Sequence, residues 1–296
     1  MLLIKKQLFD HNGNCYREGD TVSENRFKPA YVERILSSGH AELIGATPIV
    51  TRKESPLVGS IKPRNANKYA FTSISPKHAM AHAQPLAVKS WIDAGFKVLS
   101  FNGKDEIDEL KEQYPDVTFV PCRTADGLFK RPYVPISAFI EYAKTNDIEQ
   151  VMIINSDIVL KDEKGNIDKY LDWCEHGLVV ANREDHDGSF QKAIRYTHGF
   201  DIFIINVKHY GLIPETLFCM GQTWWDYWLP FRFIKKGVTV VCIKEAMFYH
   251  QTHELQYNNA EWARMTKHFQ WVEDYADGNP QKITTDVYKF IRHNLK

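Results

Sequence analysis

The chain has 296 residues, of which 44% are hydrophobic and 25% are charged, as in an ordinary globular protein. Lys and Arg together number 37, as do Asp and Glu, so the formal net charge is zero, and no overall positive field favours nucleic acid or an anionic membrane. There is no apolar run long enough to span a bilayer and no secretory signal pattern, and the five cysteines are widely spaced, which together predict a cytoplasmic protein with reduced thiols.

The first 68 residues differ in character from the rest. Residues 1–46 hold two strand-like pieces, "LLIKKQLF" and "CYREGDTV", joined by the turn-forming "DHNGN" and followed by a short helix and a brief strand. We expect a small N-terminal module, which loosely resembles modules common in phage proteins; a phage-encoded chain would work in the host cytoplasm. Residues 47–68 mix Pro, Gly, Ser and basic residues without periodicity, which predicts a linker or strap.

Strands and helices alternate from residue 69 onward. This alternation predicts an α/β fold with a Rossmann-like, mainly parallel central sheet flanked by helices on both faces. Ligands of such sheets bind beyond the carboxyl ends of the strands, so residues that follow a strand are site candidates. The expected elements are strand 69–75, helix 78–95, strand 96–102, helix 104–114, strand 117–121, helix 134–144 and strand 150–155.

The alternation is less strict after residue 160. An aromatic helix precedes the last strand-rich segment, and two helices finish the chain. We expect residues 69–296 to form one large domain. The expected segments are strand-rich 177–185, 193–206 and 237–250, and helical 223–237, 259–278 and 284–295.

The stretch "EQVMIINSDIVL" places a carboxylate between two apolar blocks. Asp157 follows the strand-like run 151–154 and precedes the apolar run 158–160. An aspartate after a strand is often a turn or cap residue. The alternative is that Asp157 holds a ligand at the edge of the sheet.

Two later motifs also place polar groups beside apolar ones. In "FYHQTH" a strand ends at His250, with His253 three residues later; these imidazoles could bind a metal, or pack and face solvent. In "GQTWWDYWLPF" Asp226 stands among three tryptophans and a tyrosine. Burial there would raise its pKa and make it a better base, whereas a plain interpretation is an acid in the first turn of a core helix.

The order of "NSD", "HGFD", "WWDYW" and "FYHQTH" resembles that in metal-dependent nucleotide-sugar glycosyltransferases with the glycosyltransferase-A fold, over roughly residues 69 to 255. The resemblance implies transfer of a sugar from a nucleoside-diphosphate sugar, with UDP favoured, to an acceptor hydroxyl. It also implies Mn²⁺ or Mg²⁺, because a divalent cation neutralises the charge that develops on the diphosphate.

The resemblance assigns roles to residues of this chain. Asp157 and His250 would hold the metal, with His253 as the alternative ligand. Asn155 stands where the family usually has the first aspartate of Asp-x-Asp, so it would orient ribose or a metal-bound water, and a metal-independent variant stays open. Asp226 would be the base of an inverting enzyme, which we slightly favour, or a sugar-binding residue of a retaining one. The other implied positions are Thr72, Ser73, Ile74, Asn102, Arg131 and Ser156 for the nucleotide, and His198, Asp201, Trp224 and Trp225 for the sugars.

Other functions remain open. The chain lacks GxxxxGK[ST], GxGxxG after its first strand, and GxSxG, which disfavours P-loop, dinucleotide-binding and α/β-hydrolase functions. A nucleotidyltransferase would need a Gly- and basic-rich loop after its first strand, where "SISPKHAM" offers only Lys77 and His78. A non-catalytic carbohydrate- or host-binding protein is a further alternative, because Asn155 replaces an acid.

The acceptor is not readable from the sequence. It could be a glycan, a modified DNA base or a protein. Zero net charge disfavours DNA, although the basic residues of the strap 52–68 could form a local patch. Neither the sugar nor the oligomeric state is encoded in a recognisable motif.

Overall fold

The computed structural model describes residues 67–80, 82–129, 131–253 and 258–296, together with short backbone segments between residues 2 and 43. The chain divides into two compact units, residues 1–64 with 292–294 and residues 65–291 with 295–296. The helix predicted after residue 22 lies outside the described residues except for helical Leu36, and so does nearly all of the strap. The predicted domain boundaries stay predictions.

The first unit contains the expected strands. Strand β1 (Leu2–Ile4) pairs antiparallel with β4 (Thr21–Val22) and with β5 (Ala41–Leu43). Strands β2 (Leu8–Phe9) and β3 (Cys15–Tyr16) pair antiparallel across the predicted turn, with Leu8 opposite Tyr16. Local alternation and a turn-forming linker are sufficient to specify such a hairpin.

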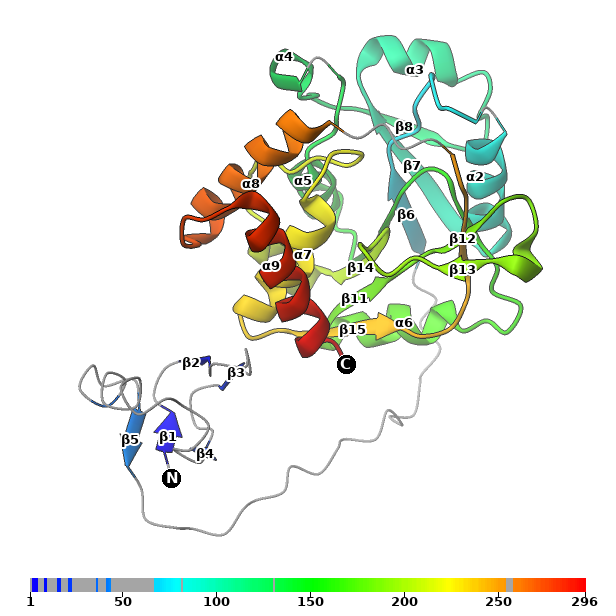
Figure 1. The fold of residues 1–296 in the computed structure, drawn as a ribbon. Helices are drawn as coiled ribbons and strands as arrows, with labels where there is room; N and C mark the ends of the chain where they lie inside the picture. Colours follow the sequence, from blue (N-terminus) through cyan, green and yellow to red (C-terminus); the bar gives the residue numbers. More distant parts are fainter. Residues whose placement is uncertain are drawn as a thin grey trace. The chain divides into compact units, whose positions relative to one another are not determined.

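The second unit is built on a seven-stranded sheet with the order β15-β11-β14-β9-β6-β7-β8 (Figure 1). All neighbouring pairs are parallel except the two that involve β14, which runs in the opposite direction. This mainly parallel sheet, flanked by helices, confirms the predicted α/β fold class. Its strands are β6 (Lys68–Thr72), β7 (Phe96–Asn102), β8 (Thr118–Pro121), β9 (Gln150–Ile154), β11 (Gly177–Ala181), β14 (Ile202–Asn206) and β15 (Thr239–Ile243).

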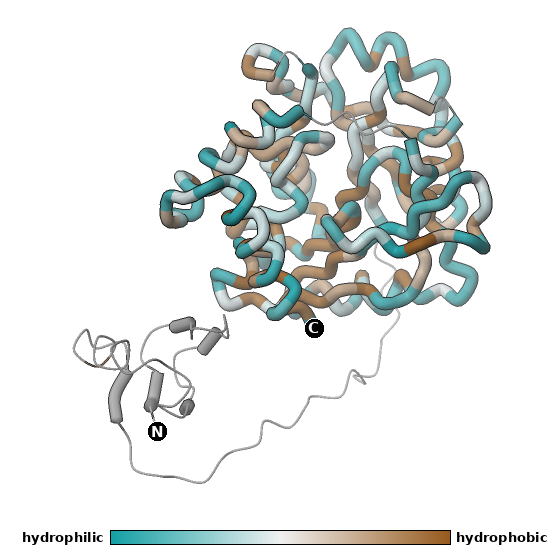
Figure 2. The backbone as a smooth tube through the Cα atoms, viewed as in Figure 1, coloured by the Kyte–Doolittle hydropathy of each residue, from teal (hydrophilic) through white to brown (hydrophobic). Residues whose placement is uncertain are grey.

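The central strands are mostly apolar, as expected for strands that are covered on both faces. In β9, Val151 and Ile153 join the hydrophobic cluster on one face, whereas Met152 and Ile154 join the cluster on the other. Figure 2 shows hydrophobic residues along the inner strands and hydrophilic ones on the outer turns. Each such side chain that leaves water contributes about 1.5–3 kcal/mol, so the centre of the sheet is its most stable part.

Helices cover the two faces unequally. The first face carries α5 (Ile136–Thr145), α7 (Trp225–Lys235), α8 (Asn259–Glu273) and α9 (Pro280–Asn294). The second carries α2 (Ala83–Asp93), α3 (Lys104–Leu110) and α6 (Ile167–Trp173). The short helical segments are α4 (Asp126–Phe129), η2 (Cys174–His176), η3 (Phe190–Lys192) and η4 (Val207–Leu212).

A second, four-stranded sheet lies at the carboxyl edge of the parallel strands. Its order is β10-β16-β12-β13, and β10, β12 and β16 each follow closely on a parallel strand of the large sheet. The sequence patterns predicted longer continuous strands here, which the structure corrects. The four members are β10 (Ile158–Leu160), β12 (Glu184–His186), β13 (Ile194–Arg195) and β16 (Phe248–Gln251).

Helix α2 begins at Ala83, five residues later than predicted. The preceding residues form a loop because side chains take over backbone hydrogen bonds, which competes with helix formation. The Gln84 amide accepts from the Ser75 N–H at 2.9 Å and donates to the Ser75 carbonyl at 2.7 Å. This loop carries His78 away from the helix. Among the described residues, no helix is both long and apolar enough to cross a bilayer.

Candidate functional site

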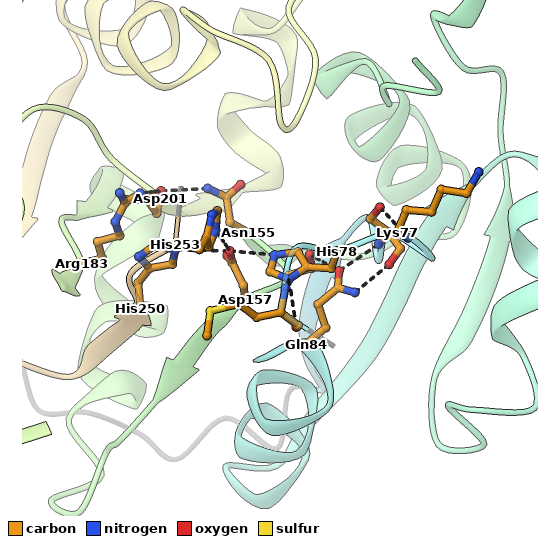
Figure 3. A network of polar contacts seen from close by, with 12 residues as sticks. Lys77, His78, Gln84, Asn155, Asp157, Arg183, Asp201, His250 and His253 are labelled. Carbon is orange, nitrogen blue, oxygen red and sulfur yellow. Dashed lines mark hydrogen bonds and ion pairs between the residues drawn. The ribbon is translucent and has the colours of Figure 1, made fainter. Parts of the chain in front are cut away.

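Asp157 lies in the tight turn between β9 and β10, where the chain passes from the large sheet to the small one. Its side chain is only 14% exposed. One carboxylate oxygen, Oδ2, contacts three imidazole Nε2 atoms, at 3.1 Å from His78, 3.4 Å from His250 and 3.5 Å from His253 (Figure 3). Burial raises the pKa of Asp157, but the hydrogen bonds from His250, His253 and His78 outweigh burial and hold it well below its usual range.

The three imidazoles come from two segments of the chain. His78 lies in the loop after β6, and its Nε2 faces Asp157. Its Nδ1 lies 3.1 Å from both the N–H and the carbonyl oxygen of Met80, and when Nδ1 donates to that carbonyl the lone pair of Nε2 is free to bind a metal. His250 lies in β16 opposite Ile158, and His253 follows two residues after that strand. The His253 ring packs edge-on against both others, at 5.4 Å and 5.1 Å between ring centroids. Three strand ends therefore bring one carboxylate and three imidazoles together.

Asp185 orients the His250 ring. The register of the parallel pair β12 and β16 sets Asp185 beside His250, and its Oδ1 accepts from Nδ1 at 2.8 Å. Asp185 also accepts from Arg183 Nε at 2.7 Å. Burial lowers the pKa of His250, but the bonds to Asp157 and Asp185 raise it to about 9 overall. A carboxylate on Nδ1 is the usual way in which proteins aim Nε2 at a metal.

The donor set fits a divalent cation. Ligand atoms of His78, Asp157 and His253 all lie within 4.8 Å of one another. Ligands about 2.0–2.2 Å from a metal lie roughly 3.0–3.4 Å apart in octahedral or tetrahedral geometry, close to the 3.1 Å and 3.5 Å that separate Asp157 from these two histidines. Imidazole-rich sets favour transition metals over Mg²⁺, which prefers oxygen ligands.

The Asn155 side chain binds Asp201 at the start of β14. Its Nδ2 donates to Asp201 Oδ1 at 2.8 Å, and Arg183 Nη1 donates to the same oxygen at 2.9 Å. Asp201 is 5% exposed, and burial raises its pKa despite Arg183. An aspartate at position 155 would set two carboxylates face to face in this buried region, which explains why an amide suits the position.

Asp226 stands in the first turn of α7, next to the "HGFD" loop. A Cβ atom at Gly199 would lie 2.5 Å from Asp226 Oδ2, so only glycine leaves the carboxylate in place. Burial and the charge of Asp201 raise the pKa of Asp226 to about 7. Hydrogen bonds from the backbone N–H groups of Asp226 and Tyr227 lower this pKa, but by less. The residue before the helix, Trp224, adopts a left-handed backbone (φ 80°), a conformation costly for a bulky side chain and common at functional sites.

The tryptophans of this motif lie in the core. Trp224 is 2% exposed and stacks on Phe269 at 4.7 Å, and Trp225 is 3% exposed and lies 4.9 Å from Phe203. The structure thus places both indoles in the hydrophobic core of the first face, where they support α7, and not on an open wall for a sugar. His198 is exposed, and its carbonyl accepts from the Tyr227 hydroxyl at 2.9 Å.

The residues predicted for the nucleotide are mostly buried. Thr72, Ile74 and Asn102 are fully buried, and Ser73 is half-buried. The Asn102 amide donates to the Ile74 carbonyl at 2.8 Å and accepts from the Ser100 hydroxyl at 2.6 Å, so it supports the loop after β6.

The last two positions predicted for the nucleotide differ in their distance from the Asp157 cluster. Ser156 donates to Gln84 Oε1 at 2.7 Å, beside Asp157. Arg131 is exposed and donates to the Tyr133 hydroxyl at 3.3 Å, with no described contact to the Asp157 cluster.

The structure therefore gathers the predicted Asp157, His250, His253, Asn155 and Asp201 in one network. Sequence reasoning did not assign a role to His78, Arg183, Asp185 or Gln84 at this site. One signal was available: "NRED" directly follows the buried run "GLVVA", just as "NSD" follows "VMII", and the ends of neighbouring parallel strands meet at the same edge.

Comparison with known proteins adds little. No family model matches the sequence, and no curated protein matches it. Among solved structures, Staphylococcus aureus TarS gives a TM-score of 0.45 at 9% identity, over 73% of this chain and 41% of that one. A Bacillus anthracis protein assigned as a glucose-1-phosphate thymidylyltransferase, in complex with sucrose, gives 0.39 at 11% identity, over 73% and 99%. A Desulfovibrio desulfuricans protein assigned as a nucleotide-diphospho-sugar transferase gives 0.39 at 10% identity, over 78% and 99%. Likenesses this distant support no statement about activity.

Proposed function

We propose that the chain is a metal-dependent glycosyltransferase that moves a sugar from a nucleoside-diphosphate sugar, preferably UDP-linked, to an acceptor hydroxyl. One observation carries this proposal: a largely covered carboxylate, Asp157, faces three imidazoles at the carboxyl edge of a mainly parallel sheet. A second carboxylate, Asp226, is close enough to Asp201 for that charge to raise its pKa. A metal site together with a desolvated base suits the departure of a diphosphate and the activation of a hydroxyl.

Asp157, His78 and His253 would hold the metal, with His250 oriented by Asp185 as a further ligand. The cation, which we propose to be Mn²⁺, would neutralise the charge that develops on the leaving diphosphate. The donor nucleotide would lie over the loop after β6, which Asn102 and Gln84 hold in shape. Hydrogen bonds from Asn155 and Arg183 would keep the Asp201 carboxylate in place.

Asp226 would act as the base. The acceptor oxygen bonds to the anomeric carbon of the donor sugar while Asp226 takes its proton. The bond between the anomeric carbon and the diphosphate oxygen breaks, and its electron pair leaves with the nucleoside diphosphate. The configuration inverts. A pKa of about 7 suits this role, because the carboxyl is then largely ionised just above neutral pH yet remains basic. In a retaining enzyme Asp226 would bind a sugar hydroxyl instead.

The test incubates the full chain with Mn²⁺ and a panel of nucleotide sugars, with release of nucleoside diphosphate as the readout. Wild type should hydrolyse at least one donor slowly, and Asp157→Asn should reduce the rate by at least about 100-fold. Asp116→Asn, at an exposed aspartate, is the matched control. Metal-independent binding of saccharides with no affinity for any nucleotide sugar would contradict the proposal. Release of pyrophosphate from a nucleoside triphosphate and a sugar phosphate would replace it with a nucleotidyltransferase.

A further inference from the structure

Four aromatic rings gather beside Asp226 at the surface. His198 is exposed, and Tyr196, Tyr227 and Tyr288 are half-buried. The His198 and Tyr288 rings are nearly parallel, 11° apart with centroids 5.8 Å from each other. The Tyr196 ring lies 5.9 Å from His198 at an angle of 56°, and the Tyr227 ring lies 6.2 Å from Tyr288 at 73°, so these two rings border the parallel pair at an angle. We call these four residues the aromatic platform; three come from the region around the "HGFD" loop and α7, and Tyr288 comes from α9.

The platform begins directly at the Asp226 carboxylate. The position of a Cβ atom on Gly199 lies 2.5 Å from Asp226 Oδ2 and 3.6 Å from Tyr196 Cε1, so the ring edge and the carboxylate meet above this glycine. The Tyr227 hydroxyl, one residue after Asp226, donates to the His198 carbonyl at 2.9 Å. A molecule resting on these rings would therefore have its edge at the carboxylate.

The charges around the platform favour a neutral occupant. The guanidinium of Arg183 lies 4.2 Å from the Tyr196 ring, but it is already paired with Asp185 and Asp201. Within the described part of the chain, Asp226 has no ion-pair partner. A polyanion such as duplex DNA would bring phosphates to this carboxylate, and the repulsion between the like charges is unfavourable. A pyranose has an apolar face that covers an aromatic ring and hydroxyls that a carboxylate can accept from.

We propose that the acceptor is a neutral pyranoside, which packs its apolar face against the stacked pair of His198 and Tyr288 rings and directs one hydroxyl to Asp226. This inference rests on the proposed function for its role as acceptor, but the platform itself can be tested without donor or metal. Tyr288 and His198 act here by binding the acceptor, so their loss should affect the acceptor and spare the donor.

The first experiment measures binding of methyl pyranosides (glucoside, galactoside and N-acetylglucosaminide) to the full chain by saturation-transfer NMR without metal. At least one should bind, and Tyr288→Ala should weaken it about tenfold, as expected for a lost stacking partner. Tyr288→Phe keeps the ring and should bind within about twofold of wild type. His198→Ala changes an exposed residue and tests the platform in a second way. Trp271→Ala, which removes a 79% exposed ring outside the platform, is the control.

The second experiment measures donor hydrolysis and transfer with the same variants. The KM for the pyranoside should rise about tenfold in Tyr288→Ala, whereas the Trp271→Ala control should keep both the wild-type KM and the wild-type hydrolysis rate with Mn²⁺. If wild type hydrolyses a donor but binds no pyranoside, or if both ring variants bind as wild type does, the inference is overturned and the transferase stands. Transfer to hydroxymethylated duplex DNA that is insensitive to Tyr288→Ala also overturns it. If a pyranoside binds in a Tyr288-dependent way but no nucleotide sugar binds, the platform is supported and the proposed transferase function is contradicted.

Discussion

Replacing Asp226 by Asn should change how the stability of the protein depends on pH. Burial and the charge of Asp201 raise the pKa of this carboxyl from 3.8 to about 7 in the folded protein. The folded state therefore prefers the protonated carboxyl. The stability that Asp226 contributes is fully present below the unfolded pKa, is lost as the pH rises from about 4 to 7, and is gone above 7. The amide of the Asp226→Asn variant would not titrate and would show no such loss.

The magnitude follows from the size of the shift. A shift of about three pKa units corresponds to roughly 4 kcal/mol in total, of which about 2 kcal/mol falls between pH 5.5 and 8.5. Because the side chain is partly exposed to water, 2 kcal/mol is an upper figure. Relative to Asp226→Asn, wild type should thus lose up to about 2 kcal/mol of unfolding free energy across this range.

Urea unfolding at several pH values measures this difference. All seven tryptophans lie in the larger unit, so their fluorescence reports on its unfolding. Asp116→Asn controls for the removal of an exposed carboxyl group. A wild-type-minus-variant difference that stays constant from pH 5.5 to 8.5 would refute the argument that Asp226 is desolvated beside Asp201.

Three further outcomes are expected. Gly199→Ala should reduce transfer at least about tenfold, measured as kcat/KM, because its Cβ would displace the Asp226 carboxylate; unchanged activity would mean that this carboxylate takes no part. Mn²⁺ at about 100 times its Kd should add about 2.7 kcal/mol to stability, a rise in Tm of roughly 5–10 °C that Asp157→Asn abolishes; an equal rise in the variant would place the metal elsewhere. Glu273→Ala should destabilise the protein by about 3–5 kcal/mol in urea unfolding, because it removes the carboxylate that pairs with the mostly buried Arg232 guanidinium at 2.8 Å; a loss below about 1 kcal/mol would contradict this.

The fold class was readable from the sequence because local patterns decide it. The run at β9 is apolar on both faces, and the predicted helix 134–144 is present as α5, with Phe139 and Ile140 buried. The position of Asp157 at the edge followed from the same rule. The short second sheet was not readable, since three-residue strands have no period long enough to recognise.

Parts of the site were missed for a different reason. His78 stands in a run that looks helical, and only the non-local bonds of Gln84 and Asp157 pull it into a loop. The motif with Trp224 and Trp225 was recognised in the sequence, but its role was predicted incorrectly. A cluster of indoles indicates large apolar surface, but the sequence does not say whether a ligand or the protein core covers it. The backbone turn at Trp224 decides that question, and no local pattern predicts it.

The reversed direction of β14 has a consequence for how this fold can diversify. Because β14 runs against its neighbours, Asp201 at its start pairs with Ala181 at the end of β11. Residues 182–200 therefore form one long connection between β11 and β14, and its two ends lie next to each other at the edge of the large sheet. Insertions or deletions within it need not shift any strand of the core. The part of this segment after β12, which carries His198, can thus vary in length and composition while Arg183 and Asp185 keep their contacts with Asp201 and His250. Under the proposed function, acceptor preference could therefore evolve separately from donor chemistry.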